Sequence, residues 1–128
     1  MGFQFKDFLK QWPIKKVLSA RDVSYSQIVL PRNQVEKHIL PLLLPEEQNL
    51  INRHEQLQIT VRDLDTMCEH QLNLWENGSS YVLTKGWNTA FVRRRGLEIG
   101  EEVGFCWDER LQELRFSVLN RPPIPHDE

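Results

Sequence analysis

The sequence predicts a small, mainly β domain, a barrel of about seven strands with two or three short helices. Apolar and polar residues alternate in short runs such as 57–62 and 103–107, a pattern typical of half-buried strands. Turn residues separate these runs. Residues 81–105 place a strand, a short helix followed by Gly96, a turn at Gly100 and another strand in a fixed order. This order of elements indicates a small barrel.

The first half of the chain is predicted to mix short strands with short helices. Residues 14–18 and 28–30 are predicted strands, and the polar segment 19–27 between them is a predicted loop. Pro31 is suited to the first position of a helix, because that position needs no backbone N–H donor. Residues 45–55 begin another helix with a proline and two glutamates, which favour a helix N-terminus.

The second half is predicted to consist mostly of strands and turns. The run 57–62 leads through the sequence DLDT into a strand that ends near Trp75, and ENGSS forms a hairpin loop before the strand 81–84. Asn88 is a candidate N-cap of the next helix, and Gly96 fits the position just beyond its C-terminal end. A turn at DERLQE precedes the final strand.

The two ends of the chain are expected to lie outside the barrel. Residues 1–13 carry an amphipathic helical stripe of Phe5, Phe8, Leu9 and Trp12. We expect this segment to pack on the barrel; binding to a membrane surface is the alternative, for which the segment has few basic residues. Residues 122–128 are expected to be a flexible tail. The expected domain is therefore residues 14–121.

Composition favours a single intracellular domain. The 40% of apolar residues suffice for one core, and Cys68 and Cys106 have no CxxC spacing that would suggest a zinc site. Neither a signal peptide nor a membrane span is predicted. The net charge of −2 is unevenly distributed, since residues 14–38 and 75–97 each carry +3 and residues 98–128 carry −5. We therefore expect a polarised molecule, in which the local field governs binding.

The candidate catalytic residues do not predict an enzyme. The four histidines lack metal-ligand spacing, and Cys68 and His70 have no third group to orient them, so a structural role is favoured over a nucleophile. Asp63 and Asp65 are predicted to form an Asx-type turn rather than a cation site. Phosphate-binding glycine motifs are absent from the sequence. We expect neither a cofactor nor a bound metal.

Aromatic and basic residues allow several interpretations. Trp87 and Trp107 lie in apolar alternation and are predicted core residues, whereas Trp75, at the edge of a polar loop, is expected to shield or position that loop instead of filling the core. The basic run RRR at residues 93–95 is interpreted in three ways. It forms a solvated helix end favoured by the helix dipole, a nuclear import signal, or a set of phosphate contacts.

Two polar segments contain the side chains that a reader of double-stranded DNA needs. Such a reader uses short polar groups for base edges and Arg or Lys for phosphate and guanine. The first segment supplies Ser19, Arg21, Ser24, Tyr25, Ser26 and Gln27, with Arg32 just beyond. The second supplies Trp75, Asn77, Ser79 and Ser80. On composition alone these segments are also ordinary surface loops.

Longer motifs in the same regions resemble the plant B3 DNA-binding domain. KKVLSARDVSYSQIVLPRNQVEKHILPLL is similar to the family's first arm with the strand and helix that follow it. WENGSSYVLTKGW is similar to the second arm and the next strand. RRGLEIGEEVGFCWD and FSVLNR resemble one plant branch long catalogued as proteins of unknown function. The resemblance extends from about Ile14 to Arg121.

This resemblance implies an open seven-stranded pseudobarrel whose two loops act as arms in the major groove of double-stranded DNA. It implies sequence-specific DNA binding in transcriptional regulation in the plant nucleus, with other transcription or chromatin proteins as further partners. The resemblance makes Arg21, Ser24, Gln27 and Arg32 first-arm candidates and Trp75, Asn77, Ser79 and Ser80 second-arm candidates. Candidate phosphate contacts are Lys15, Lys16, Lys85, Arg93, Arg94 and Arg95.

Two alternatives stay open at the level of sequence. Arg21 and Gln27 differ from the serine and the arginine that many members of the family carry there, so the DNA element of other members does not transfer. A barrel that serves as a protein-interaction module is the main alternative. The recognition domain of an endonuclease is a weaker one, because the sequence lacks a nuclease cluster of carboxylates and lysine.

Overall fold

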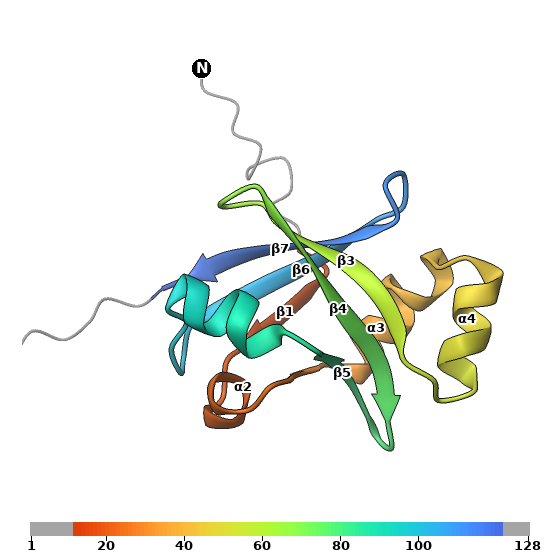
Figure 1. The fold of residues 1–128 in the computed structure, drawn as a ribbon, viewed down its shortest axis with the longest axis horizontal. Coiled ribbons are helices and arrows are strands. Elements are labelled where there is room, and N and C mark those ends of the chain that lie inside the picture. Colours follow the sequence, from red (N-terminus) through yellow and green to blue (C-terminus); the bar gives the residue numbers. More distant parts are fainter. Residues whose placement is uncertain (1–11, 122–128) are drawn as a thin grey trace, which may run out of the picture.

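Seven strands form one strongly curved sheet in the computed structural model, which describes residues 12–121 (Figure 1). The strands are β1 (Ile14–Val17), β2 (Ile28–Leu30), β3 (Leu57–Asp63), β4 (Cys68–Asn77), β5 (Ser80–Thr84), β6 (Glu102–Asp108) and β7 (Glu113–Asn120). Their order in the sheet is β1-β6-β7-β3-β4-β5-β2. Neighbouring strands pair antiparallel except for β3 and β7, which are parallel. Among the described residues β1 and β2 are the two edges, so the predicted open seven-stranded barrel is confirmed.

Short helices lie on two sides of this barrel. They are α2 (Ala20–Ser24), α3 (Arg32–His38), the 3₁₀ turn η1 (Leu40–Leu42), α4 (Pro45–Asn52) and the π-helix η2 (Asn88–Arg93). Figure 1 shows α3 and α4 on one side and η2, in teal, on the other. Helix α3 starts one residue later than predicted, because Pro31 has an extended backbone and occupies the N-cap position.

Aromatic residues fill the centre of the barrel. Trp87 is fully buried and stacks on Phe91, with ring centroids 5.3 Å apart and planes inclined by 16°. Phe91 meets the edge of Phe116 at 4.7 Å, and Phe105 lies 5.5 Å from Phe116. Trp107 is also buried. The prediction that Trp87 and Trp107 are core residues is therefore confirmed.

The polar segment 19–27 contains a helix that the sequence analysis treated as loop. Ser19 caps α2, since its Oγ accepts from the Asp22 backbone N–H at 3.3 Å. The Asp22 carboxylate accepts in return from the Ser19 backbone N–H at 2.9 Å. This reciprocal pair is a capping box, which satisfies two donors that a helix start otherwise leaves exposed. The prediction of an irregular loop here was wrong.

The start of η2 also differs from the prediction, and its end agrees with it. Asn88 is not the N-cap, because Trp87 before it already has helical backbone angles, and the Asn88 amide instead bonds to the backbone of the α2 segment. Gly96 has a φ of +63° just beyond the last helical residue. The Leu97 N–H donates to the Val92 carbonyl at 2.9 Å. This bond and the left-handed glycine are typical of a Schellman motif, so the role of Gly96 is confirmed.

The helical stripe expected for residues 1–13 lies outside the described residues except at Trp12 and Pro13, and the expected tail 122–128 lies outside them entirely. Trp12 is buried against Gly104 of β6, where a Cβ would come within 3.0 Å of the indole ring. Glycine at position 104 therefore allows Trp12 to pack directly against the backbone of β6. In the part of the chain that the structure describes, every helix is too short or too polar to cross a membrane.

Replacing Trp87 by Ala tests the core assignment. We expect a loss of about 3–5 kcal/mol in the free energy of unfolding, the usual result of truncating a buried tryptophan. Urea denaturation followed by circular dichroism measures it. Tyr25→Ala is the control, because Tyr25 is 54% exposed and its loss should cost less than about 0.5 kcal/mol. Equal unfolding midpoints for Trp87→Ala and wild type would refute the assignment.

Candidate nucleic-acid interface

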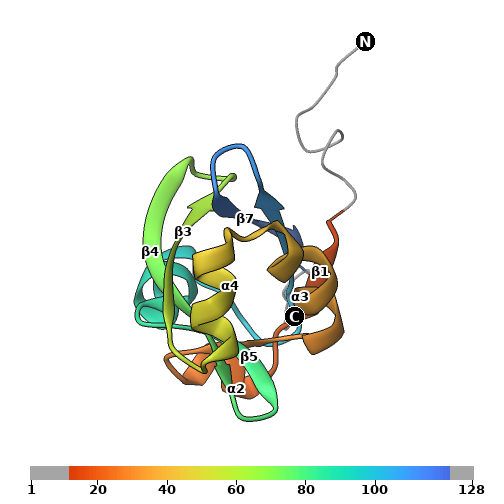
Figure 2. The ribbon, with the colours of Figure 1, turned by 90° about the vertical axis from the view of Figure 1, so that its right-hand side faces the viewer.

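Two polar segments lie at the same end of the barrel. We call residues 19–27, with α2, the first arm, and residues 75–80, with the β4–β5 turn, the second arm. Figures 1 and 2 both show α2 and the β4–β5 turn at the same end, while the β3–β4 and β6–β7 turns lie at the opposite end. Strand β2 begins at the first arm and runs antiparallel to β5, which begins at the second arm, so Ile28 lies opposite Leu83 and Leu30 opposite Tyr81. This pair of strands therefore fixes the spacing between the two arms.

The buried carboxylate of Asp22 organises the first arm. Its oxygens accept from the Ser19 N–H at 2.9 Å, the Ser19 hydroxyl at 3.0 Å and the Val29 N–H at 3.3 Å. The Lys16 ammonium lies 3.5 Å from the same carboxylate. Buried carboxylates need such partners, because desolvation of an unpaired charge is costly. Ser19 and Lys16, both candidate DNA contacts, are thus engaged within the protein.

Two side chains at the start of η2 fix the backbone of the first arm. The Trp87 indole N–H donates to the Asp22 carbonyl at 2.8 Å. The Asn88 amide donates to the Val23 carbonyl at 3.1 Å and to the Tyr25 carbonyl at 3.4 Å. The first arm is therefore tied to the core at three successive points of its backbone.

The remaining polar side chains of the first arm point toward solvent. Arg21, Ser24, Tyr25 and Ser26 are exposed, and Gln27 is half-buried. The guanidinium carbon of Arg21 lies 5.6 Å from the centre of the Tyr25 ring, within the range of a cation–π contact. A fixed backbone with exposed hydroxyl, phenol and guanidinium groups suits the recognition of a polar surface.

The second arm is a tight hairpin rather than a loose loop. Asn77 and Ser80 face each other as the last pair of β4 and β5, so only Gly78 and Ser79 form the turn. Gly78 has a φ of +67°, which glycine adopts without strain. The prediction that the whole ENGSS sequence is loop was therefore wrong at Glu76, Asn77 and Ser80. Asn77 and Ser79 are exposed at the tip.

Trp75 supports the second arm from the side. It is half-buried, lies opposite Val82 on β5, and donates its indole N–H to the His54 carbonyl at 3.0 Å. It is absent from the main core cluster, so the prediction that Trp75 positions the arm instead of filling the core is supported by its contacts. Arg32 also reaches this arm, since its Nε donates to the Ser79 carbonyl at 2.9 Å.

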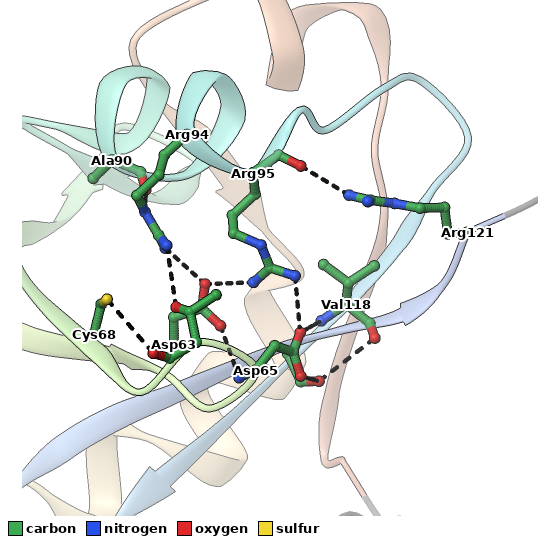
Figure 3. Close-up of polar contacts among 10 residues, drawn as sticks. Asp63, Asp65, Cys68, Ala90, Arg94, Arg95, Val118 and Arg121 are labelled. Carbon is green, nitrogen blue, oxygen red and sulfur yellow. Dashed lines mark hydrogen bonds and ion pairs between the residues drawn. The ribbon is translucent and has the colours of Figure 1, made fainter.

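The basic run 93–95 is largely neutralised by two acidic residues (Figure 3). Arg94 donates to the Asp63 carboxylate at 2.6 Å, and Arg95 bonds to both Asp63 and Asp65. Asp63 is fully buried. Asp65 in addition accepts from the Val118 N–H at 2.9 Å. The cluster thus joins the end of the η2 helix to the β3–β4 turn and to β7.

The structure separates the six candidate phosphate contacts into two groups. Lys16, Arg94 and Arg95 form ion pairs within the protein. Lys15, Lys85 and Arg93 are exposed. Lys85 follows β5, whose residue Leu83 pairs with Ile28 at the end of the first arm. An import receptor needs accessible basic side chains, so the ion pairs of Arg94 and Arg95 disfavour the interpretation of this run as a nuclear import signal.

Other chemically active side chains have structural surroundings. Asp63 accepts the Asp65 N–H at 2.9 Å, so the predicted Asx-type turn is confirmed. His70 contacts the Phe91 ring at 5.3 Å, and burial, with the Arg94 charge, lowers its pKa. Burial raises the pKa of the Cys106 thiol, which keeps it a poor nucleophile. Residues 12–121 contain no group of three or more His, Cys, Asp or Glu placed to bind a metal.

Comparison with known sequences identifies the family. The model of the C-terminal domain of B3 domain-containing protein At5g26805 matches residues 12–119. The chain therefore belongs to the B3 domain family. It is 42% identical over 86% of its length to B3 domain-containing protein At1g78640 and 35% identical over 95% to B3 domain-containing protein At4g02870, both from Arabidopsis thaliana. It spans 22% and 39% of the lengths of these relatives.

More distant relatives and solved structures agree with this assignment. The chain is 29% identical over 71% of its length to the Arabidopsis AP2/ERF and B3 domain-containing transcription factor RAV1, of which it spans 25%. The Arabidopsis FUS3–DNA complex has the same fold, with a TM-score of 0.63, 23% identity, and coverage of 88% of this chain and 100% of that one. The Arabidopsis thaliana LEC2–DNA complex also has this fold, with a TM-score of 0.60 and 27% sequence identity. The match covers 83% of this chain and 90% of that one.

Several residues that shape the arms were not identified from sequence. Glu76 and Asn88 hold the arms through hydrogen bonds to distant segments, and nothing in their local sequence indicates these partners. Asp22 holds the first arm through its bonds to Ser19 and Val29. One local signal does exist. Ser19 and Asp22 have the S-x-x-D spacing of a capping box, which indicates both the helix and a structural role for Ser19.

Asp63→Ala tests whether the basic run is a structural cluster. Removing one partner of a buried ion pair strands the other charge, so we expect the free energy of unfolding to fall by about 3 kcal/mol. Urea denaturation at neutral pH measures this change. Arg93→Ala is the matched control, because Arg93 is exposed and its removal should cost less than about 0.5 kcal/mol. Similar small effects for both variants would contradict the cluster.

Proposed function

We propose that this B3 domain binds double-stranded DNA with sequence preference, using its two arms in the major groove, and acts in transcriptional regulation in the plant nucleus. The observation that carries the proposal is the arrangement of the arms. Two polar segments, far apart in sequence, lie at one end of the barrel, and each is anchored to the scaffold by hydrogen bonds. The similar folds of the FUS3 and LEC2 complexes with DNA support it.

The exposed side chains of the arms have the chemistry of base readout. Asn77 presents an amide that donates and accepts, the pattern that pairs with adenine in the major groove. Arg21 presents a guanidinium, which pairs with guanine or with phosphate. Ser24, Ser26 and Ser79 add hydroxyl groups that serve either role. The arms therefore supply both specific and positioning contacts.

The exposed cations supply the contacts to phosphate. Lys15, Lys85 and Arg93 remain available because they are exposed at the surface. Each contact to a duplex phosphate releases about one counterion and makes binding salt-dependent. With only a few such cations, the domain should bind random DNA weakly and depend on its arms for affinity.

Transcriptional regulation and a nuclear location follow from the relatives rather than from any single residue. RAV1 is named as a transcription factor, and the relatives compared above come from a plant. Other transcription or chromatin proteins are the expected further partners. We assign no catalytic role, because the arms contain no nucleophile paired with a base.

Selection of bound duplexes from a random pool, at low and moderate salt, tests the proposed function. Sequence-preferring arms should enrich one motif that persists at the higher salt. Recovery of bound duplexes that share no motif would show that the domain binds DNA only nonspecifically. Absence of any retained DNA would favour the alternative, a B3 barrel that serves as a protein-interaction module.

Arg21→Ala and Asn77→Ala separate specific readout from general affinity. Each change should reduce the preference for the selected duplex over a scrambled one by ~1–3 kcal/mol, the usual worth of a good base contact. Fluorescence anisotropy with both duplexes measures it. Thermal stability should barely change, because both side chains are exposed. Unchanged preference in both variants would remove these residues from the interface.

Salt dependence distinguishes free cations from paired ones. Lys85→Ala should reduce the slope of log K against log salt by ~0.9, the value for one contact to duplex phosphate. Arg94→Ala should leave this slope unchanged, because its guanidinium is bound to Asp63. Titrations at four salt concentrations give the slopes. A larger change in slope for Arg94→Ala than for Lys85→Ala would reverse this assignment.

A further inference from the structure

Arg32 stands at the start of α3 but directs its guanidinium onto the second arm. Its Nε donates to the Ser79 carbonyl at 2.9 Å, and its Nη2 lies 3.4 Å from the Gly78 carbonyl. Both residues of the hairpin turn are thus held by one side chain. These carbonyls are at the tip of the arm, where no neighbouring strand is available to bond them.

The same guanidinium holds the base of the hairpin. Its Nη2 donates to the Glu76 carboxylate at 2.8 Å, and its central carbon lies 4.6 Å from the centre of the Tyr81 ring. The other oxygen of Glu76 lies 3.3 Å from His54 Nδ1. Arg32 therefore contacts the last residues of β4, the turn and the first part of β5.

These contacts leave little of the guanidinium for DNA. Its Nη1 donates to Glu36 at 3.0 Å, so all three nitrogens are engaged, and one face of the guanidinium plane lies against the Tyr81 ring. The hydrogen bond to Glu76 raises the pKa of Arg32, which favours the protonated guanidinium. Four of the five N–H donors are therefore used, and a phosphate could reach only the second hydrogen of Nη1 without displacing a partner.

The position of Arg32 in the chain makes it a rigid support. It follows β2 by two residues, and Leu30 of β2 pairs with Tyr81 of β5. β2 itself begins where the first arm ends. A planar guanidinium with donors in a fixed fork can hold several acceptors at once, which an ammonium cannot.

We propose that Arg32 is a positioning residue, which holds the β4–β5 turn in the orientation that presents Asn77 and Ser79, and that it makes no phosphate contact. This inference rests on the proposed function for its effect on DNA recognition. The contacts of Arg32 with the hairpin are a property of the free protein, so their effect on the hairpin is tested without DNA.

Arg32→Lys is the decisive variant because it keeps the positive charge and removes the fork. A phosphate contact would survive this change, with nearly the same affinity and salt slope. A positioning role would not survive it. In that case the preference for the selected duplex should fall about tenfold, while the salt slope stays at the wild-type value. Glu36→Gln is the matched control, since it removes a partner of the same guanidinium outside the arm.

A double-mutant cycle with Asn77→Ala separates indirect from direct action. If Arg32 acts by placing Asn77, removing Asn77 in the Arg32→Lys background should cost little further preference. Additive losses from the two changes would show that Arg32 acts independently of Asn77, and would overturn the proposal.

Backbone ¹⁵N relaxation of the DNA-free protein completes the test. In Arg32→Lys the order parameters of residues 77–80 should fall from about 0.85 toward 0.6, while the strand residues stay rigid. Unchanged order parameters would contradict the proposal that Arg32 holds the β4–β5 turn, whatever the DNA measurements show. If wild type shows no duplex preference, the proposed function fails, and the relaxation data still decide whether Arg32 holds the hairpin.

Discussion

The hydrogen bond from the Trp87 indole to the Asp22 carbonyl joins the core to the first arm at 2.8 Å. The Trp87 ring is fully buried on Phe91, so its polar N–H must find a partner inside the protein. That requirement fixes the backbone of Asp22, whose carboxylate in turn holds Ser19 and Val29. The orientation of the first arm is therefore a consequence of core packing, and a change in the core should alter the end of the barrel that carries the arms.

Charge in this molecule is used more for structure than its sequence implies. Arg94 and Arg95 close on Asp63 and Asp65, and they tie the η2 helix to β3 and β7. Arg32 likewise forms an ion pair within the protein, with Glu76. Because few cations remain for phosphate, affinity for random DNA should be modest. Under the proposed function, the geometry of the two arms then accounts for most of the discrimination between DNA sequences.

The barrel was predictable because alternation is a local signal: β3 displays it residue by residue, β6 displays it except at Gly104, and Gly96 marks a helix end. The arms were only partly predictable. Composition identified Arg21 and Asn77, but it could not show that Arg32 bonds Ser79 across 47 residues or that Arg94 is paired. Such partners are set by the fold. The capping box at Ser19 was legible and was missed, since the polar composition of the segment suggested a loop.

Titration of ¹⁵N-labelled wild-type protein with a selected duplex tests the central claim most directly, because it maps the contact surface residue by residue. The account predicts chemical-shift changes in residues 19–27 and 76–80 and at Lys15, Lys85 and Arg93, and none at Leu64, Met67 or Leu111 at the opposite end of the barrel. Changes centred on that opposite end, or spread without focus on either arm, would contradict binding through the two arms.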